Sequence, residues 1–347
     1  MWYEPRVASD GSSVPVDVLH WDDFVDVLTS PVRRADLGGP SGGIVVVRDA
    51  PEAIGAPEAL LGAELTEAAR ALPVVIVLDR PNHESTPATA VADVAATGVD
   101  LDLLLERVTT NPQAATALAL LLRGGRTRSV VDGLIAESAV YSTLQGGNEF
   151  RRWRAEHPRR ERGAATTPAV RVSSAAGTLD IVLSRPEVRN ALDARMRDEL
   201  WDAFLVAAAD PDLAVRWSAD GPSFCGGGDL DEFGSVPDPA TGHIVRLTRS
   251  LGLAIHQLAG RTTVHVHGAC TGSGIELPAF ARRIVAAPDS TFCLPELGLG
   301  LIPGAGGTVS LPIRIGRHRT AWLALTGRAI DADTALGWGL VDAIDRP

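Results

Sequence analysis

Residues 264–308 read VHVHGACTGSGIELPAFARRIVAAPDSTFCLPELGLGLIPGAGGT. A run of β-forming residues, 264–267, leads into a turn of small residues, 268–274. An apolar segment with the composition of a helix follows, and Glu276 lies near its start. A second loop contains Glu296 and ends in a cluster of glycines. The same alternation of strand, glycine-rich loop and helix recurs through the second half of the chain and predicts an α/β core.

Two carboxylates of this stretch, Glu276 and Glu296, lie beside glycines. Glycine lets the backbone approach a ligand closely because it has no Cβ atom. We therefore interpret the stretch as a site in which backbone N–H groups hold an anion and two carboxylates transfer protons. The alternative is that the glycines serve tight packing and that both glutamates are solvated.

The composition is that of a globular protein with a sizeable core. The 347 residues allow one large domain or two smaller ones, and 45% of them are hydrophobic and 22% charged. The formal net charge of −11 disfavours binding to nucleic acid. All 32 basic residues are arginines, which excludes a lysine Schiff base, a Walker A lysine and a Ser-Lys dyad.

Three cysteines, Cys225, Cys270 and Cys293, occur without a CxxC spacing. This arrangement predicts neither a disulfide framework nor a zinc cluster, and the histidines show no metal-binding spacing, so we expect no bound metal. The first residues lack a signal pattern, and no run of about 18 apolar residues occurs. These observations predict a cytoplasmic protein that does not enter a membrane.

Glycine-rich loops in the second half match none of the familiar phosphate or nucleophile motifs. There is no GxGxxG, no GxxxxGK[ST], and no GxSxG around Ser273. Two loops, 226–229 and 272–274, are each followed by a segment that resembles the start of a helix. Two backbone N–H groups that converge there would form an oxyanion hole, which suits a thioester whose oxygen gains charge as an enolate forms.

The N-terminal part has a different organisation. Residues 43–48 and 73–78 have the pattern of buried strands around a helical segment, 56–72, which predicts a βαβ unit with a parallel pair. Helices are expected from residue 86 to 161, and no catalytic constellation is apparent there. A polar group on one of these helices has the composition of a solvated face: Glu137, Ser138, Tyr141 and Ser142.

Residues 151–165 contain six arginines and form the best candidate for a linker. One interpretation is a patch that meets the phosphates of a nucleotide-containing ligand. The other is a solvated connector. We predict an N-terminal accessory region with a basic linker at residues 1–165, in which α/β structure gives way to helices, and a catalytic domain at 166–347.

The second half resembles the crotonase (enoyl-CoA hydratase/isomerase) superfamily across about residues 168–345. The resemblance implies a crotonase-like spiral of ββα repeats in this half. The segments that carry it, in the family's order, are SRPEVRNALDARMRDEL, GPSFCGGGDLDEF, HGACTGSGIELPAFA, FCLPELGLGLIPGAGGT and LTGRAIDADTALGWGLVD.

The resemblance implies roles for individual residues. Gly228 and Ser273 fall where the family supplies the two oxyanion N–H groups, and the family usually has glycine in place of Ser273. Glu276 and Glu296 fall on the two glutamates with which the family's hydratases deliver water across an α,β double bond. The positions that fall where the family contacts coenzyme A, largely through backbone, are Arg189, Ala191, Gly228, Asp229, Leu230 and Asp231.

Both glutamates together favour an enoyl-CoA hydratase, a lyase of the kind used in fatty acid metabolism. The alternatives are enoyl-CoA isomerisation, acyl-CoA hydrolysis, or a non-catalytic subunit that binds acyl-CoA, which the serine at 273 motivates. Coenzyme A would be part of the substrate, so no separate cofactor is expected. The family's assemblies imply a homo-oligomer, a trimer or hexamer. Typical members continue with a helical tail beyond the position of Pro347, and we hypothesise that helices within residues 100–150 replace it.

Overall fold

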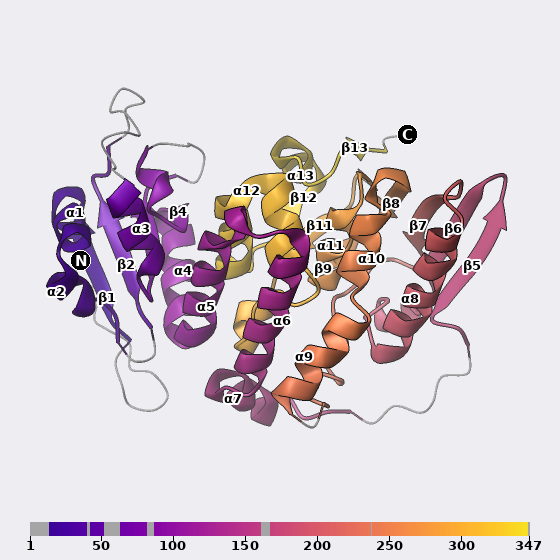
Figure 1. Ribbon diagram of the computed structural model, residues 1–347, viewed down its shortest axis with the longest axis horizontal. Helices are drawn as coiled ribbons and strands as arrows, with labels where there is room; N and C mark the ends of the chain where they lie inside the picture. Colours follow the sequence, from indigo (N-terminus) through magenta and orange to yellow (C-terminus); the bar gives the residue numbers. More distant parts are fainter. Residues whose placement is uncertain are drawn as a thin grey trace. The chain divides into compact units, whose positions relative to one another are not determined.

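The computed structural model of the protein describes residues 14–39, 42–51, 63–81, 87–160, 167–236 and 238–345. The chain packs into two compact units, and Figure 1 labels their helices and strands. The first unit comprises the described residues up to Thr127 together with Arg317–Gly327. The second comprises Arg128–Gly316 and the residues from Arg328 on. The chain therefore returns to the first unit after it has formed most of the second.

A four-stranded parallel sheet forms the centre of the first unit. Its strands follow the order β1 (Val16–His20), β2 (Ile44–Arg48), β3 (Val75–Asp79) and β4 (Val94–Ala96). The two middle strands are continuous apolar runs, as is typical of strands covered on both faces. Helix α3 (Ala63–Ala71) connects them, which confirms the predicted βαβ unit and its parallel pair. Of the helix expected over residues 56–72, the part before residue 63 lies outside the described residues.

An ion pair joins helix α5 (Pro112–Arg123) to the segment that leads into β4. Arg123 donates to Asp93 from Nε at 2.7 Å and from Nη2 at 2.5 Å, and both side chains are buried. Asp93 also accepts from the N–H of Ile76 at 2.8 Å, so its charge is satisfied. The α-helices of this unit that precede residue 128 are α1 (Trp21–Thr29), α2 (Pro31–Ala35), α3, α4 (Gly98–Thr110) and α5 (Pro112–Arg123).

Two sheets form the second unit. The larger has the order β13 (Ala343–Ile344), β10 (Arg283–Ala286), β8 (Thr262–Val266), β7 (Ala214–Ala219), β6 (Thr178–Leu183) and β5 (Val170–Ala175), and only the β5–β6 pair is antiparallel. The smaller has the order β12 (Ile330–Asp331), β11 (Thr291–Cys293) and β9 (Ala269–Thr271). The chain passes from the larger sheet to the smaller twice, from β8 to β9 and from β10 to β11, and glycine-rich loops with helices follow. This repetition confirms the predicted α/β core.

Helices pack around these sheets, and capping side chains mark where several begin. Asp193, for example, accepts from the N–H of Met196 at 2.7 Å and starts α8. The predicted single helix over residues 245–258 is in fact two. The α-helices of this unit are α6 (Val130–Gln145), α7 (Asn148–Glu156), α8 (Ala194–Ala209), α9 (Pro239–Thr248), α10 (Leu251–Gln257), α11 (Ser273–Glu276), the first part of α12 (Gly307–Thr326) and α13 (Ala332–Trp338).

The arginine-rich segment is not a free connector in its described part. Residues 151–156 belong to α7, and the guanidinium of Arg154 lies over the ring of Trp153 at 4.6 Å. Arg154 donates to the carbonyl of Leu230 at 2.5 Å, and the backbone N–H of Arg160 donates to Asp231 at 3.1 Å. Residues 151–156 are thus helical and not a free connector, although Arg151, Arg159 and Arg160 are exposed to solvent as the connector interpretation expects. Arg162 lies outside the described residues.

Packing divides the chain at Thr127, whereas the prediction places the domain boundary at 165. The reason is that α6 packs against α9 and α10, and α7 against the short 3₁₀ helix η7 (Glu296–Leu299). Figure 1 shows α6 beside α9. The boundary at 165 remains a prediction of where the part of the chain that resembles the crotonase superfamily begins. None of the helices in the described ranges combines the length and the apolarity that a bilayer crossing requires.

Candidate active site

Two loops of the second unit run side by side and form the floor of the site. The N–H of Cys225 donates to the carbonyl of Ala269 at 3.3 Å, and the N–H of Thr271 donates to the carbonyl of Cys225 at 2.9 Å. A Cβ atom on Gly274 would lie 2.4 Å from the carbonyl oxygen of Cys225, so only glycine permits this approach. The two glycine-rich loops identified in the sequence are thus brought together.

Gly228 and Ser273 extend from these paired segments. Neither backbone N–H donates a hydrogen bond to any residue in the described ranges, although Ser273 is buried. Buried N–H groups are almost always paired, so the unpaired N–H of Ser273, together with that of the half-buried Gly228 on the adjacent loop, suits a ligand oxygen. The hydroxyl of Ser273 lies 3.8 Å from the sulfur of Cys225, in contact distance of the neighbouring loop.

Glu276 and Glu296 meet at Gly272. A Cβ atom on Gly272 would lie 2.4 Å from Oε1 of Glu296 and 3.7 Å from Oε1 of Glu276. Oε2 of Glu276 accepts from the N–H groups of Ala305 at 2.8 Å and Gly307 at 2.9 Å. Oε2 of Glu296 is buried and has no hydrogen-bond partner among the described residues. The pair therefore offers an unsatisfied acceptor beside a second carboxylate.

The surroundings favour the protonated forms of both carboxyl groups. Burial, the negative charge of Glu296 and that of Glu137 raise the pKa of Glu276 well above its ordinary value. Burial, with a smaller effect of Glu137, raises the pKa of Glu296 to about 8. At neutral pH the pair therefore holds at least one proton, and the form with one acid and one base becomes populated as Glu296 ionises with a pKa of about 8.

A third carboxylate, Glu137, reaches the same loop from α6. Its Oε1 accepts from the N–H of Gly306 at 2.7 Å, and its Oε2 accepts from the N–H of Thr308 at 2.9 Å and from the hydroxyl of Thr308 at 2.7 Å. Glu137 is only 2% exposed, and burial raises its pKa to about 7.

The prediction that this helix presents a solvated polar face is therefore wrong. Glu137, Ser138, Tyr141 and Ser142 are all buried. One sequence signal could have identified them: these residues share one face of a helix whose other positions are mostly apolar. A polar face on such a helix needs partners inside the protein.

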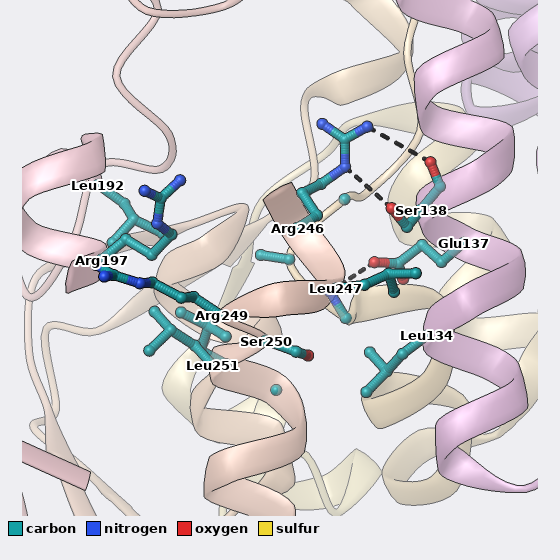
Figure 2. A pocket seen from close by; sticks show the side chains of 15 residues that line it. Leu134, Glu137, Ser138, Leu192, Arg197, Arg246, Leu247, Arg249, Ser250 and Leu251 are labelled. Carbon is teal, nitrogen blue, oxygen red and sulfur yellow. Dashed lines mark hydrogen bonds between the residues drawn. The ribbon is translucent and has the colours of Figure 1, made fainter. Parts of the chain in front are cut away.

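Arg246 supplies the positive charge on this face. Its guanidinium lies 4.7 Å from the centroid of the Tyr141 ring, and its Nε donates to the hydroxyl of Ser138 at 3.2 Å. It also donates to the hydroxyl of Ser142. Figure 2 shows the guanidinium directed toward Ser138 on α6. A Cβ atom on Gly304 would lie 2.3 Å from the Tyr141 ring, so the ring packs directly on the loop that holds Glu276.

A cavity of about 130 Å³ lies between α6, α8, α9 and this loop (Figure 2). Leucine side chains from α6, α9 and α10 and from positions 192 and 277 form part of its wall. Arg197 and Arg249, also at the wall, share the carboxylate of Asp198 and so are not free charges. The lining residues are Leu134, Glu137, Ser138, Leu192, Arg197, Arg246, Leu247, Arg249, Ser250, Leu251, Gly252, Leu277, Gly304, Ala305 and Gly306.

The positions expected to contact coenzyme A also gather in the structure. Arg189 accepts at its carbonyl from the N–H of Gly226 at 2.8 Å, which joins the turn that precedes Ala191 to the glycine loop. The N–H of Asp229 donates to the carbonyl of Leu192 at 2.9 Å. Leu230 is exposed, whereas Asp229 is buried and lies 3.6 Å from the guanidinium of Arg185. Asp231 is held by Arg160, as described above.

Asn190 fixes that turn, and its replacement by Ala should cost about 3 kcal/mol of unfolding free energy. Its side chain is fully buried, accepts from the N–H of Arg185 and donates to the carbonyls of Asp220 and Ser223. Its φ of 52° also disfavours alanine. Urea unfolding measures the effect. The control, Asn148→Ala at an exposed position, should change stability by about 0.5 kcal/mol or less; equal losses would contradict the assigned role.

The profile of the family described as enoyl-CoA hydratase/isomerase matches residues 173–346, half of the chain. The chain belongs to the enoyl-CoA hydratase/isomerase family. This family carries the crotonase fold, so the crotonase-like core predicted for the second half is confirmed. Among the described residues, no group of three or more His, Cys, Asp or Glu side chains is arranged to hold a metal ion.

Named members resemble this part of the chain. A carnitinyl-CoA dehydratase of Proteus mirabilis is 31% identical over 182 residues, 51% of this chain and 67% of the relative. Another, of Citrobacter koseri, is 35% identical over 172 residues, 48% of this chain and 64% of the relative. The chain thus spans about two thirds of these curated relatives. A crystal structure of enoyl-CoA hydratase from Thermoplasma volcanium is 30% identical, with 52% of this chain and 72% of that chain covered and a TM-score of 0.48.

Proposed function

We propose that the protein is an enoyl-CoA hydratase that adds water to the double bond of a 2-enoyl-CoA. The observation that carries this proposal is the pair of buried carboxylates at Gly272, one of which has an oxygen without a partner among the described residues. Such a pair can hold a water molecule between two carboxyl groups. The named dehydratase relatives support it, since dehydration is the reverse of hydration.

The thioester oxygen would accept from the N–H groups of Gly228 and Ser273. Water bound between Glu276 and Glu296 would lose a proton to the ionised carboxylate while its oxygen bonds to Cβ. The electrons of the double bond would move toward the thioester oxygen as an enolate. As the enolate collapses, the protonated carboxyl group would transfer its proton to Cα. One water is consumed and the pair keeps one proton, which now lies on the other carboxyl group. Transfer of that proton between the two carboxyl groups, directly or through solvent, restores the initial state.

The cavity beside Gly304 suits a short acyl group. An apolar cavity of about 150 Å³ holds one benzene molecule, so a cavity of 130 Å³ has room for roughly four to six carbons. Leu134, Leu251 and Leu277 would contact the chain. The CoA moiety would lie along the 228–231 loop and the 189–191 turn. In this arrangement, residues from α6 contribute to acyl selection.

The test uses the intact chain and a panel of 2-enoyl-CoA esters with short, medium and long acyl groups. We expect products heavier by one water, formed fastest from the short esters. A product of unchanged mass would indicate isomerisation, and free CoA would indicate thioester hydrolysis; either outcome replaces the proposal. Binding to several esters without any product would identify a non-catalytic acyl-CoA-binding protein.

A further inference from the structure

Four successive backbone N–H groups, two just before α12 and two in its first turn, are divided between two carboxylates. Ala305 and Gly307 donate to Glu276, whereas Gly306 and Thr308 donate to Glu137. The first N–H groups of a helix have no partners within the helix, so their direction depends on the groups that accept from them. Glu276 and Glu137 accept from alternating N–H groups of residues 305–308. A rotation of this segment that breaks the hydrogen bonds to one carboxylate would therefore also break those to the other.

Close packing between α6 and this segment fixes Glu137 in place. A Cβ atom on Gly133 would lie 2.8 Å from the side chain of Val309, and the Tyr141 ring lies against Gly304. These contacts hold α6 to the segment on either side of Glu137. The carboxylate therefore cannot withdraw from Gly306 and Thr308 by a simple shift of the helix.

We propose that Glu137 is a positioning residue of this site: it fixes the 304–308 segment so that Ala305 and Gly307 keep donating to Glu276. This inference rests on the proposed hydratase function and adds a residue that lies outside the family-matched segment, 173–346. Glu137 acts through the loop and through its charge. It need not touch the acyl group to do so.

The charge of Glu137 has a second effect on the pair. Negative charge at Glu137 raises the pKa of both Glu276 and Glu296. Arg246 lowers the pKa of Glu137 and so helps to keep this negative charge in place. Tyr141 on α6 and His243 on α9, which contacts Ser138 at 2.9 Å, are the other titratable groups nearby. Since the pKa of Glu137 is about 7, its charge is present above that pH, where the pair loses its last proton.

The Glu137→Gln variant tests the proposal. The amide removes the charge and offers only one acceptor to two N–H donors. We expect kcat to fall about tenfold to a hundredfold with little change in KM, because the loop shifts while the acyl contacts remain. The alkaline limb of the pH profile of kcat should move to lower pH by about one unit, because a negative neighbour no longer raises the pKa of the pair. Glu137→Asp keeps the negative charge, so the alkaline limb of its pH profile should lie close to that of the wild type.

Two controls separate this role from a general effect on folding. Glu156→Gln removes an exposed carboxylate from α7 and should leave kcat and the limb unchanged. Thr308→Val removes only the hydroxyl that donates to Glu137, which disfavours the charge on Glu137 and should move the limb in the same direction by a smaller amount. If Glu137→Gln fails to fold, Thr308→Val still tests the effect of the charge of Glu137 on the pair.

A readout without turnover keeps the proposal separate from the hydratase assignment. Carbon-13 NMR of labelled glutamate carboxyls reports the titration of Glu276 and Glu296 in the absence of substrate. A downward shift of their titration in Glu137→Gln would support the proposal even if no enoyl-CoA were hydrated. Unchanged titration together with unchanged kcat and pH profile in both Glu137→Gln and Thr308→Val would overturn it.

Discussion

Replacement of Glu276 or Glu296 by Gln should lower turnover of a short 2-enoyl-CoA by about 10²–10⁴-fold. Each substitution keeps the size of the side chain and removes one proton-transfer group. Glu276→Gln also places an amide where two N–H groups donate, at Ala305 and Gly307. Both variants should still bind acyl-CoA, because the N–H groups of Gly228 and Ser273 are untouched. Steady-state rates and calorimetric titration with the CoA ester measure the two properties.

Glu156→Gln, at an exposed position on α7, is the matched control and should keep the wild-type rate. Stability gives a second check on Glu296. Its pKa of about 8 exceeds that of a glutamate in the unfolded chain, so the folded state holds more protons between the two values and loses stability as pH rises through that interval. Glu296→Gln should therefore stabilise the protein at pH above about 8 although it lowers turnover. Wild-type rates in both glutamate variants would refute the assignment.

Gly272→Ala should reduce turnover about as severely, for a steric reason. The added Cβ would lie 2.4 Å from Oε1 of Glu296, and the residue's φ of 50° is one that alanine rarely adopts. The carboxylate would have to move away from Glu276. A displacement of about 1 Å at a catalytic group can cost about a hundredfold in rate. Rates and thermal unfolding of the same variant separate loss of activity from loss of folding.

Gly260→Ala is the matched control, because a Cβ atom there meets no atom within 4 Å and the backbone conformation needs no glycine. It should behave like the wild type in both measurements. Full turnover in Gly272→Ala would show that the reaction does not require Glu296 at its present position beside Gly272. That result would contradict the proposal that the pair of carboxylates carries out the reaction.

The sequence predicts the elements of the second unit well where the signal is local. The strand expected at 178–183 is β6, and Asp193 caps α8 near the expected start. Glu276 and Glu296 could be singled out because the glycines that let them approach each other are their neighbours in the chain. The two glycine-rich loops that hold Gly228 and Ser273 are also apparent from local composition, whereas the choice of these two residues as oxyanion donors rests on the family resemblance.

Long-range packing explains what the sequence could not show. Glu137 and Gly306 are separated by 169 positions in the chain, and nothing near Glu137 indicates that its partners are the N–H groups of a distant loop. The apolar positions around this polar face indicate that it is buried, but they do not indicate which distant group it contacts. The arginines of α7 illustrate the same limit: a run of charge is usually solvated, yet Arg154 stacks on Trp153 and donates to the 229–231 loop.

The return of Arg317–Gly327 to the first unit has a practical consequence for dissecting this protein. In α12 the backbone leaves helical geometry at Gly316 (φ 80°, ψ 159°), and the residues that follow bind within the first unit, where Arg317 donates to the carbonyls of Thr89 and Ala92. Ala321, Trp322 and Leu323 are buried there. A fragment that begins at Arg128 would carry this apolar segment without its partners and should aggregate on expression. No single cut in the chain yields either unit whole. An inactive truncated fragment would therefore show only that it is insoluble, and not that the removed residues are needed for function. Point substitutions in the full sequence avoid this ambiguity.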